Sequence, residues 1–309
     1  AIDSSRYESF PVYVTPDGAW LTGDVLRERG NYLLDANNRK KTREVTLDVT
    51  AGRTGRLIPK KTGLLGGSEV TEFDVAIPSF HGLFGEDGQV QGLFEIAGVA
   101  YAGMRTMASS ILMDKSATKK FMQALDIPVL PYAVLKRPAE GYFIAADKID
   151  KTLKESGFSF PCILKPSHLG SSIGVAKVTS IEEVSACLPA VFEYDDTAIL
   201  EPFVPNLVEY NVAVARFSGK IETSATERPK AKDELLDFKQ KYLSGGGSKS
   251  GSKTPGASSE GMLSLTREIN PKFDAATENN IRAWAARMFE GIDGTGAPRY
   301  SGDIGVAGG

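Results

Sequence analysis

The chain has 309 residues, of which 41% are hydrophobic, so it is long enough to bury sizeable cores in two or three compact units. Its 36 basic and 39 acidic residues nearly cancel, which excludes the strongly basic surface that is typical of proteins that bind nucleic acid. No apolar run approaches the roughly 20 residues that cross a bilayer, and no charged-then-apolar leader opens the chain, so we expect a soluble, cytoplasmic α/β protein with no membrane partner.

The start of the chain predicts a strand and a turn. Residues 6–14 alternate between apolar and polar side chains as a half-buried strand does, and residues 15–18, Thr-Pro-Asp-Gly, form a strong turn signal. The residues before Arg6 resemble the end of a helix. A first strand, the usual centre of a doubly wound sheet, is therefore expected upstream of Ala1.

The next segments predict a mixed pattern of strands and helices. Residues 73–78 indicate a buried strand that leads into a loop at residues 81–88. After it we expect a short helix over 91–97, an edge strand at 100–101 and one long amphipathic helix over 106–125.

Beyond residue 129 the pattern changes to strand, helix, strand. The expected elements are a strand at 162–165 with a hairpin partner at 174–178, a helix at 180–188 capped by Ser180, strands at 198–201 and 209–217, and a helix at 274–289. Residues 239–260 are rich in glycine, serine and lysine, which fits either a linker between domains or a lid within one domain. Two isolated cysteines, Cys162 and Cys187, could pair, but buried thiols in a reducing compartment are the better interpretation.

The strongest local signal is KPSHLGSSIGV, residues 165–175. A lysine at the end of a buried strand, followed by a Gly-Ser-Ser loop and a return strand, suits the binding of phosphate. Backbone N–H groups and hydroxyls can hold the phosphate oxygens while the ammonium of Lys165 offsets their charge. A polar hairpin with a solvated lysine is the alternative that this motif alone leaves open.

Three further residues strengthen the phosphate interpretation. Lys115 opens a helix, where the helix dipole and an ammonium both favour an anion. The alternative for this residue alone is a lysine that faces solvent. Glu201 and Glu209 could accept hydrogen bonds from an adenine amine and a ribose diol, although acids at strand ends are common. Taken together, these residues predict a nucleotide held between two sheets.

Longer motifs resemble a known family. HGLFGEDGQVQGLFEIAGVAYAG at residues 81–103, MASSILMDK at 107–115, KPSHLGSSIGV and DFKQKYL at 237–243 are similar to the signature stretches of bacterial D-alanine–D-alanine ligases. The resemblance runs from about residue 4 to residue 299. It implies an ATP-grasp fold preceded by a doubly wound α/β domain, with domains at 1–104, 105–195 (small ATP-grasp subdomain) and 196–309 (large subdomain).

The resemblance also implies a role for each matching residue. Phosphates would be held by Lys115, Lys165, Gly170 and Ser172, adenine and ribose by Glu201 and Glu209, the transferred phosphate by Lys241, and the oxyanion by Arg299, while Ser171 and Tyr242 would lie near the first D-alanine and His81 near the acceptor. Two alternatives remain: His81 could merely order its loop, and Tyr242 could merely anchor the lid. Glu86 and Asp87 are interpreted as structural residues that accept hydrogen bonds from the backbone of the glycine-rich loop.

The sequence departs from the family pattern in several places. Ser301 stands where the family has an aspartate, and the Glu-x-Asn metal motif expected after Arg299 is not found before Gly309. Glu268 and Asn270 spell that motif but precede Arg299, so we interpret them as a coincidence and name no metal ligands. The lid has Leu236 and Phe238 where tyrosines are common. We therefore expect the natural protein to extend further at both ends.

The resemblance implies an ATP-dependent ligase that joins two D-alanines through an acyl-phosphate for peptidoglycan precursor synthesis. ATP and Mg²⁺, or Mn²⁺, would be required, and a homodimer is expected. Alternatives are a related ligase with D-lactate, D-serine or another amino acid as acceptor, and a nucleotide-binding protein without catalysis.

Overall fold

A computed structural model describes residues 2–32, 35–50, 54–60, 69–170, 173–229, 267–272 and 274–295. The chain divides into two compact units, of which the first comprises Ala1–Pro78 with Gly92–Ala102 and the second comprises Ser79–Gln91 with Gly103–Gly309. The predicted boundary at residue 195 stays a prediction. In the described part of the chain, no helix is both long and apolar enough to cross a membrane.

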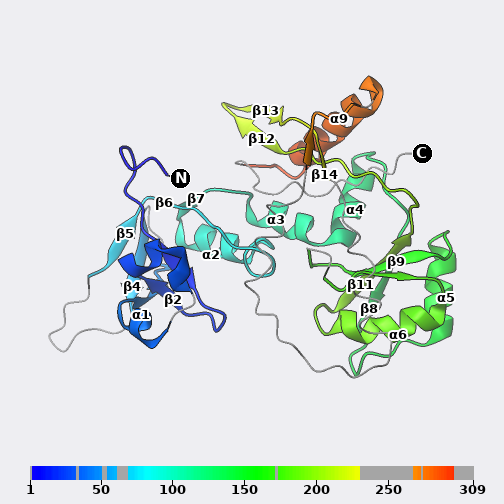
Figure 1. Cartoon of the computed structure of the whole chain (residues 1–309), viewed down its shortest axis with the longest axis horizontal. Coiled ribbons are helices and arrows are strands. Elements are labelled where there is room, and N and C mark those ends of the chain that lie inside the picture. The colour runs from blue at the N-terminus through cyan, green and yellow to red at the C-terminus, as the bar shows by residue number, and fades with distance from the viewer. Residues whose placement is uncertain are drawn as a thin grey trace. The chain divides into compact units, whose positions relative to one another are not determined.

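The first unit contains a five-stranded sheet in which each strand pairs with the next one along the chain (Figure 1). Its strands are β1 (Val12–Val14), β2 (Trp20–Thr22), β3 (Arg43–Leu47), β4 (Gly55–Pro59) and β5 (Thr71–Phe73), and every pair is antiparallel. The predicted turn closes the first hairpin, where the Thr15 backbone N–H donates to the Ala19 carbonyl at 2.9 Å. Two 3₁₀ helices, η1 (Asp24–Arg27) and η2 (Arg29–Tyr32), and α1 (Ala36–Lys40) connect β2 to β3.

The doubly wound pattern expected for this unit holds in only one place. Strands β6 (Val75–Ala76) and β7 (Ala100–Tyr101) are parallel, and α2 (Gln89–Ala97) lies in the connection between them. The five-stranded sheet is instead an antiparallel meander. Two of its connections, residues 15–19 and residues 48–54, are shorter than the dozen or so residues that a parallel crossover needs, so those strand pairs must be antiparallel.

Two strand predictions in the first unit need correction. Only the last three of residues 6–14 form a strand, and residues 73–78 contain only the last residue of β5 and the two-residue β6 instead of one strand. The chain bends at Asp74 between the antiparallel sheet and the parallel pair. Val75 and Ile77 are about half exposed, at 49% and 48%, so this segment is not the buried strand that its apolar composition predicted.

The second unit begins with two helices where one was predicted. The predicted helix over 106–125 is divided into α3 (Thr106–Met113) and α4 (Lys115–Ala124). Asp114 between them has an extended backbone, and its side chain accepts hydrogen bonds from the N–H groups of Ser116 and Ala117. An aspartate in this position is a strong N-cap, so the chain starts a new helix at Lys115, as the lysine motif predicted.

A four-stranded antiparallel sheet forms the first core of the second unit, in the order β10-β9-β11-β8. Its strands are β8 (Ala133–Lys136), β9 (Cys162–Pro166), β10 (Ala176–Val178) and β11 (Thr197–Pro202), and α5 (Ala146–Glu155) and α6 (Ile181–Phe192) pack against it (Figure 1). Ser180 caps α6 as predicted. Cys162 and Cys187 are buried, unpaired thiols in this core, which confirms that they do not pair; the reducing compartment stays a prediction.

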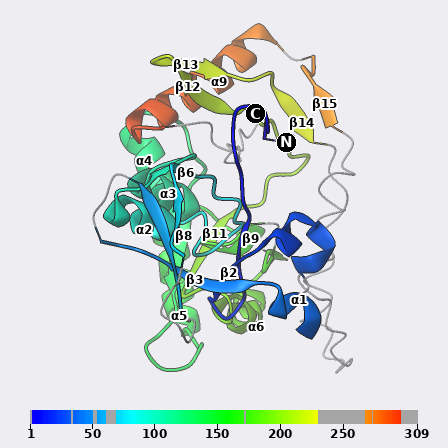
Figure 2. The ribbon, with the colours of Figure 1, turned by 90° about the vertical axis from the view of Figure 1, so that its left-hand side faces the viewer.

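A second core joins distant parts of the same unit. Helix α9 (Ala275–Gly291) packs against the hairpin of β12 (Val214–Phe217) and β13 (Lys220–Thr223), as Figure 2 shows. Apolar residues of α3, α4 and α9 share this core, among them Ala108, Met122 and Ile281. Of the strand predicted at 209–217, only the last four residues are in β12. Strands β14 (Glu227–Pro229) and β15 (Arg267–Ile269) form a separate antiparallel pair.

Candidate nucleotide-binding site

The two lysines predicted to bind phosphate lie beside the same loop. Lys165 is near the end of β9, and the loop at residues 167–170 follows it directly. The first residue of α4, Lys115, donates from its backbone N–H to the Ser167 carbonyl at 3.0 Å. The Nζ of Lys115 donates to the carbonyls of Ser167, at 3.3 Å, and Leu169. Tertiary structure thus brings together two lysines that are 50 residues apart.

The charge of Lys115 is poorly stabilised in this environment. Burial disfavours the ammonium and the nearby ammonium of Lys165 repels it, which together lower the pKa of Lys115 to about 8. Carbonyl oxygens solvate the ammonium only in part. A bound polyanion would offset both charges, so the chemistry of this site fits a phosphate group.

Glu201 lies on the neighbouring strand β11 and is buried. Its Oε1 pairs with Lys119 Nζ at 2.6 Å, and its Oε2 pairs with Lys165 Nζ. Burial alone would raise the pKa of Glu201, but the two ammonium groups outweigh it and hold the pKa below its ordinary value. The predicted adenine ligand is therefore a carboxylate already engaged with two cations. Glu209, the predicted ribose ligand, is exposed in the segment before β12.

Lys119 was missed by sequence reasoning. It lies four residues after Lys115 on α4, so both side chains emerge on one face of the helix. That spacing was the only available signal, and it is common on solvated helices. Its partner Glu201 is 82 residues further along the chain, which no local pattern reveals.

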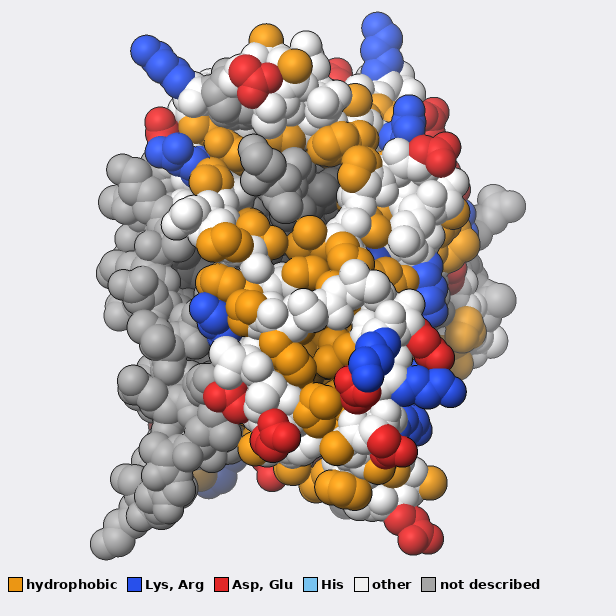
Figure 3. Space-filling view, turned by 90° about the vertical axis from the view of Figure 1, so that its right-hand side faces the viewer, with side chains coloured by type: hydrophobic (Ala, Val, Ile, Leu, Met, Phe, Trp, Pro, Cys, Tyr) orange, Lys and Arg blue, Asp and Glu red, His pale blue; other side chains and the backbone are white. Residues whose placement is uncertain are grey.

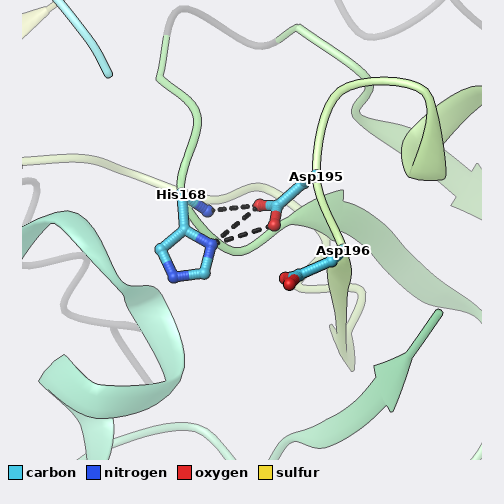
Figure 4. Close-up of side chains that lie close together, drawn as sticks. All are labelled: His168, Asp195 and Asp196. Atoms are coloured by element: carbon cyan, nitrogen blue, oxygen red, sulfur yellow. Dashed lines mark hydrogen bonds and ion pairs between the residues drawn. The ribbon is translucent and has the colours of Figure 1, made fainter. Parts of the chain in front are cut away.

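Hydrogen bonds between His168 and Asp195 hold the loop that begins at residue 167, as Figure 4 shows. The backbone N–H of His168 donates to Asp195 Oδ2 at 2.7 Å, and its ring Nδ1 lies 2.9 Å from Asp195 Oδ1. Ser167 Oγ donates to Asp114 Oδ1 at 2.6 Å. Burial would raise the pKa of Asp114, but hydrogen bonds from Ser167 and Ser116 outweigh it and lower the pKa. The network joins α4, the loop after β9 and the residues before β11.

Within the described ranges, one grouping has the side-chain types and proximity for a metal ion: His168, Asp195 and Asp196. Internal hydrogen bonds engage both oxygens of Asp195, which also accepts from the Thr197 N–H at 3.0 Å, and one oxygen of Asp196, which accepts from the Thr197 hydroxyl at 2.8 Å. This grouping therefore does not fit a Mg²⁺ site, which requires several free oxygen ligands.

Glu268 and Asn270, which spell the Glu-x-Asn sequence before Arg299, make structural contacts. Glu268 on β15 forms an ion pair with Arg228 Nη2 on β14 at 2.6 Å. Asn270 follows β15, and its backbone N–H donates to the Thr226 carbonyl at 2.8 Å. These contacts hold the β14–β15 pair together, and the interpretation that the motif is not a metal site stays a prediction.

The glycine-rich loop at residues 81–88 is organised by its own acids. Glu86 accepts from the Gly82 N–H, and Asp87 accepts from the N–H groups of Phe84 and Gln89. This confirms their interpretation as structural residues. Gly88 has a φ of +94°, and a Cβ there would lie 2.3 Å from Ser110 Oγ on α3, so a side chain does not fit. His81 is exposed at the start of this loop, and its acceptor-site role stays a prediction.

Several predicted site residues lie outside the described residues. They are Ser171, Ser172, Lys241, Tyr242 and Arg299, together with the lid at 237–260, Leu236 and Ser301. Gly170, a further predicted phosphate ligand, follows Leu169, whose carbonyl accepts a hydrogen bond from Lys115 Nζ.

The described surface agrees with the balanced charge of the sequence. On the face shown in Figure 3, acidic and basic side chains are interspersed around apolar areas, and no basic stripe runs across it.

The fold and the candidate site together define an ATP-grasp protein, in which lysines from α4 and β9 lie beside one loop and a buried glutamate.

Comparison with known proteins places the chain more narrowly. Residues 1–104 match the family model described as the D-ala D-ala ligase N-terminus, and residues 121–302 match the model of the D-ala D-ala ligase C-terminus. The chain belongs to the D-alanine–D-alanine ligase family. It is 31% identical to the D-alanine–D-alanine ligase of Mycolicibacterium vanbaalenii, over 96% of this chain and 76% of the relative. It is also 31% identical to that of Bifidobacterium animalis subsp. lactis, over 97% of this chain and 79% of the relative.

Solved structures share the fold. The VanG D-Ala:D-Ser ligase from Enterococcus faecalis superposes with a TM-score of 0.68 at 21% identity, covering 96% of this chain and 76% of that one. The D-alanine–D-alanine ligase from Coxiella burnetii gives 0.67 at 20% identity, covering 94% and 69%. These similarities confirm the predicted ATP-grasp fold.

Proposed function

We propose that this chain is an ATP-dependent ligase that joins two D-alanine molecules. The observation that carries the proposal is the convergence of Lys115 and Lys165 on the loop after β9, in a chain of the D-alanine–D-alanine ligase family. The two ammonium groups repel each other, and a triphosphate relieves that repulsion.

The proposed reaction proceeds in two steps. The carboxylate of the first D-alanine attacks the γ-phosphorus of ATP, and ADP leaves. The amine of the second D-alanine then attacks the acyl-phosphate carbon, loses a proton and displaces inorganic phosphate, which forms the dipeptide. Lys115 and Lys165 offset the phosphate charge in the first step, when anionic oxygens approach each other.

The remaining roles are proposed from the family motifs. Glu201 and Glu209 would hold adenine and ribose, and Gly170, Ser172 and Lys241 would hold phosphate. Ser171, Tyr242 and His81 would line the amino-acid sites, with Arg299 at the oxyanion.

We further propose that Mg²⁺ or Mn²⁺ accompanies ATP and supplies additional charge neutralisation. The described residues do not define its ligands. A cytoplasmic location agrees with the two buried, unpaired thiols. Peptidoglycan precursor synthesis and a homodimer follow from the family resemblance.

The test is a measurement of ADP and phosphate release with ATP, Mg²⁺ and D-alanine, with the dipeptide identified by mass spectrometry. L-Alanine is the matched control and should give no turnover. D-Serine and D-lactate, each mixed with D-alanine, test the alternative acceptors. Phosphate release only with a mixed pair would replace this proposal by a mixed-ligase function, and ATP binding without any release would favour a nucleotide-binding protein.

A further inference from the structure

Lys165 faces two anions if the chain binds ATP. Its ammonium pairs with Glu201 Oε2, and the proposed function requires the same ammonium at a phosphate. The Glu201 side chain is only 9% exposed, so water cannot fully replace the lost partner. A buried carboxylate without a cation is costly. ATP binding therefore requires a second cation that stays with Glu201.

Lys119 has the contacts of such a cation. Its Nζ lies 2.6 Å from Glu201 Oε1 and donates to the Leu130 carbonyl at 3.3 Å. It also lies over the ring of Tyr132, with 5.5 Å to the centroid. The side chain is 14% exposed, against 23% for Lys165. Lys119 is thus the more enclosed of the two partners, and contacts besides Glu201 keep it in position.

We propose that Lys119 is a positioning residue that remains the counter-ion of Glu201 while Lys165 transfers to the phosphates of ATP. This inference rests on the proposed function. The exchange forms a Lys165–phosphate contact as the Lys165–Glu201 contact breaks, and no covalent bond changes. Lys119 keeps Glu201 ionised and oriented throughout, which preserves it as a hydrogen-bond acceptor.

The proposal predicts a pH effect that appears only when Lys119 is lost. The charged groups that face Glu201 are Lys115 and Lys119 from α4 and Lys165 from β9, and Tyr132 faces Lys119 from the segment before β8. In a Lys119→Met variant, departure of Lys165 leaves Glu201 buried with no adjacent partner. Its pKa then rises and it takes up a proton, so ATP affinity increases as pH falls.

The experiment measures the Kd of ATP with Mg²⁺ by calorimetry from pH 5.5 to 7.5 for wild type, K119M and K120M. Lys120 is the matched control because it is the next residue of α4 and is exposed. At pH 7.5, K119M should bind at least about tenfold more weakly than wild type, whereas K120M should match wild type. As pH falls, K119M should regain affinity relative to wild type by up to about tenfold per pH unit.

A double-mutant cycle separates positioning from packing. In an E201Q background no carboxylate needs a counter-ion, so adding K119M should leave the Kd and its pH profile unchanged. If K119M does not fold, Lys119→Gln serves instead, since it keeps a donor but carries no charge. A wild-type pH profile for the Lys119 variant, with the same loss of affinity in the E201Q background, would overturn the inference. Failure of wild type to bind ATP would instead overturn the proposed function.

Discussion

The two larger sheets of this protein use charged side chains in opposite ways. In the five-stranded meander, the Lys60–Glu44 pair lies on the surface: the two side chains approach to 2.8 Å and are 52% and 31% exposed. In the four-stranded sheet of the second unit, Glu201 holds two lysines while it is 9% exposed. The chemical groups are the same, and only their access to water differs.

This difference separates stabilisation from function. Water and salt screen the surface pair, so it contributes little to stability and its charges respond weakly to a neighbour. Burial in the second sheet strengthens every electrostatic interaction, and there the pKa of Lys115 falls to about 8. The buried charges are those that a bound phosphate can reorganise, which supports the proposal that ATP binds at this sheet.

The largest effect should follow removal of the buried anion. Glu201→Gln leaves two enclosed lysines unpaired and should reduce the free energy of unfolding by about 3–5 kcal/mol, whereas Glu44→Gln should cost no more than about 1 kcal/mol. Urea denaturation measures both. Trp20 and Trp284 are the only tryptophans and lie in different units, so W20F and W284F backgrounds assign each transition. Equal losses for the two variants would show that burial does not distinguish the sheets.

Nucleotide affinity should depend on Lys165 of β9 and Lys115 of α4, and not on a surface lysine of the meander. Lys165→Ala should weaken ATP binding by about 1.5–3 kcal/mol, roughly 10- to 100-fold in Kd, because a charge-assisted contact to phosphate is lost. Lys115→Ala should act similarly. Lys60→Ala, at the exposed residue just after β4, is the control and should bind as wild type in calorimetry. Unchanged affinity in both site variants would remove the basis of the ATP-grasp site.

The two units also differ in aspartates that cap helices by accepting hydrogen bonds from backbone N–H groups. Asp114 caps α4 and also accepts from Ser167 Oγ at 2.6 Å, whereas Asp35 caps the five-residue α1, which buries no residue. Asp114→Ala should cost about 1–2 kcal/mol of unfolding free energy and Asp35→Ala about 0.5 kcal/mol. Urea denaturation in the single-tryptophan backgrounds measures each. A larger loss for Asp35→Ala would contradict the idea that the site network adds to the cap.

The smallest effect concerns pH. Lys115 has a pKa of about 8 in the free protein, and a bound phosphate raises it, so ATP binding above pH 8 takes up a proton. Affinity should therefore fall as pH rises, by roughly fourfold between pH 7 and pH 8.5. Calorimetry in two buffers of different ionisation enthalpy detects the proton uptake. Lys115→Met should abolish both the uptake and this pH dependence, and their persistence would assign the titration to another group.

Local signals predicted a large part of the second unit. The sequence correctly predicted the Ser180 cap, the strand that ends near Lys165 and the α9 helix, because each depends on interactions among near neighbours. The Asp114 cap is equally local, but it was not predicted. Reading residues 106–125 as a single helix failed because apolar periodicity continues across Asp114, although the side chain of that residue begins a second helix.

The sequence by itself determined the family and indicated the loop and the two lysines that we propose bind phosphate, because these depend on residue types at short spacings. Only the tertiary structure decided that Glu201 is shared by Lys119 and Lys165, that Asp195 holds His168, and that the first sheet is an antiparallel meander. These features depend on contacts between distant segments. Such contacts form when the hydrophobic cores bring those segments together, so they cannot be predicted from the pattern of neighbouring residues.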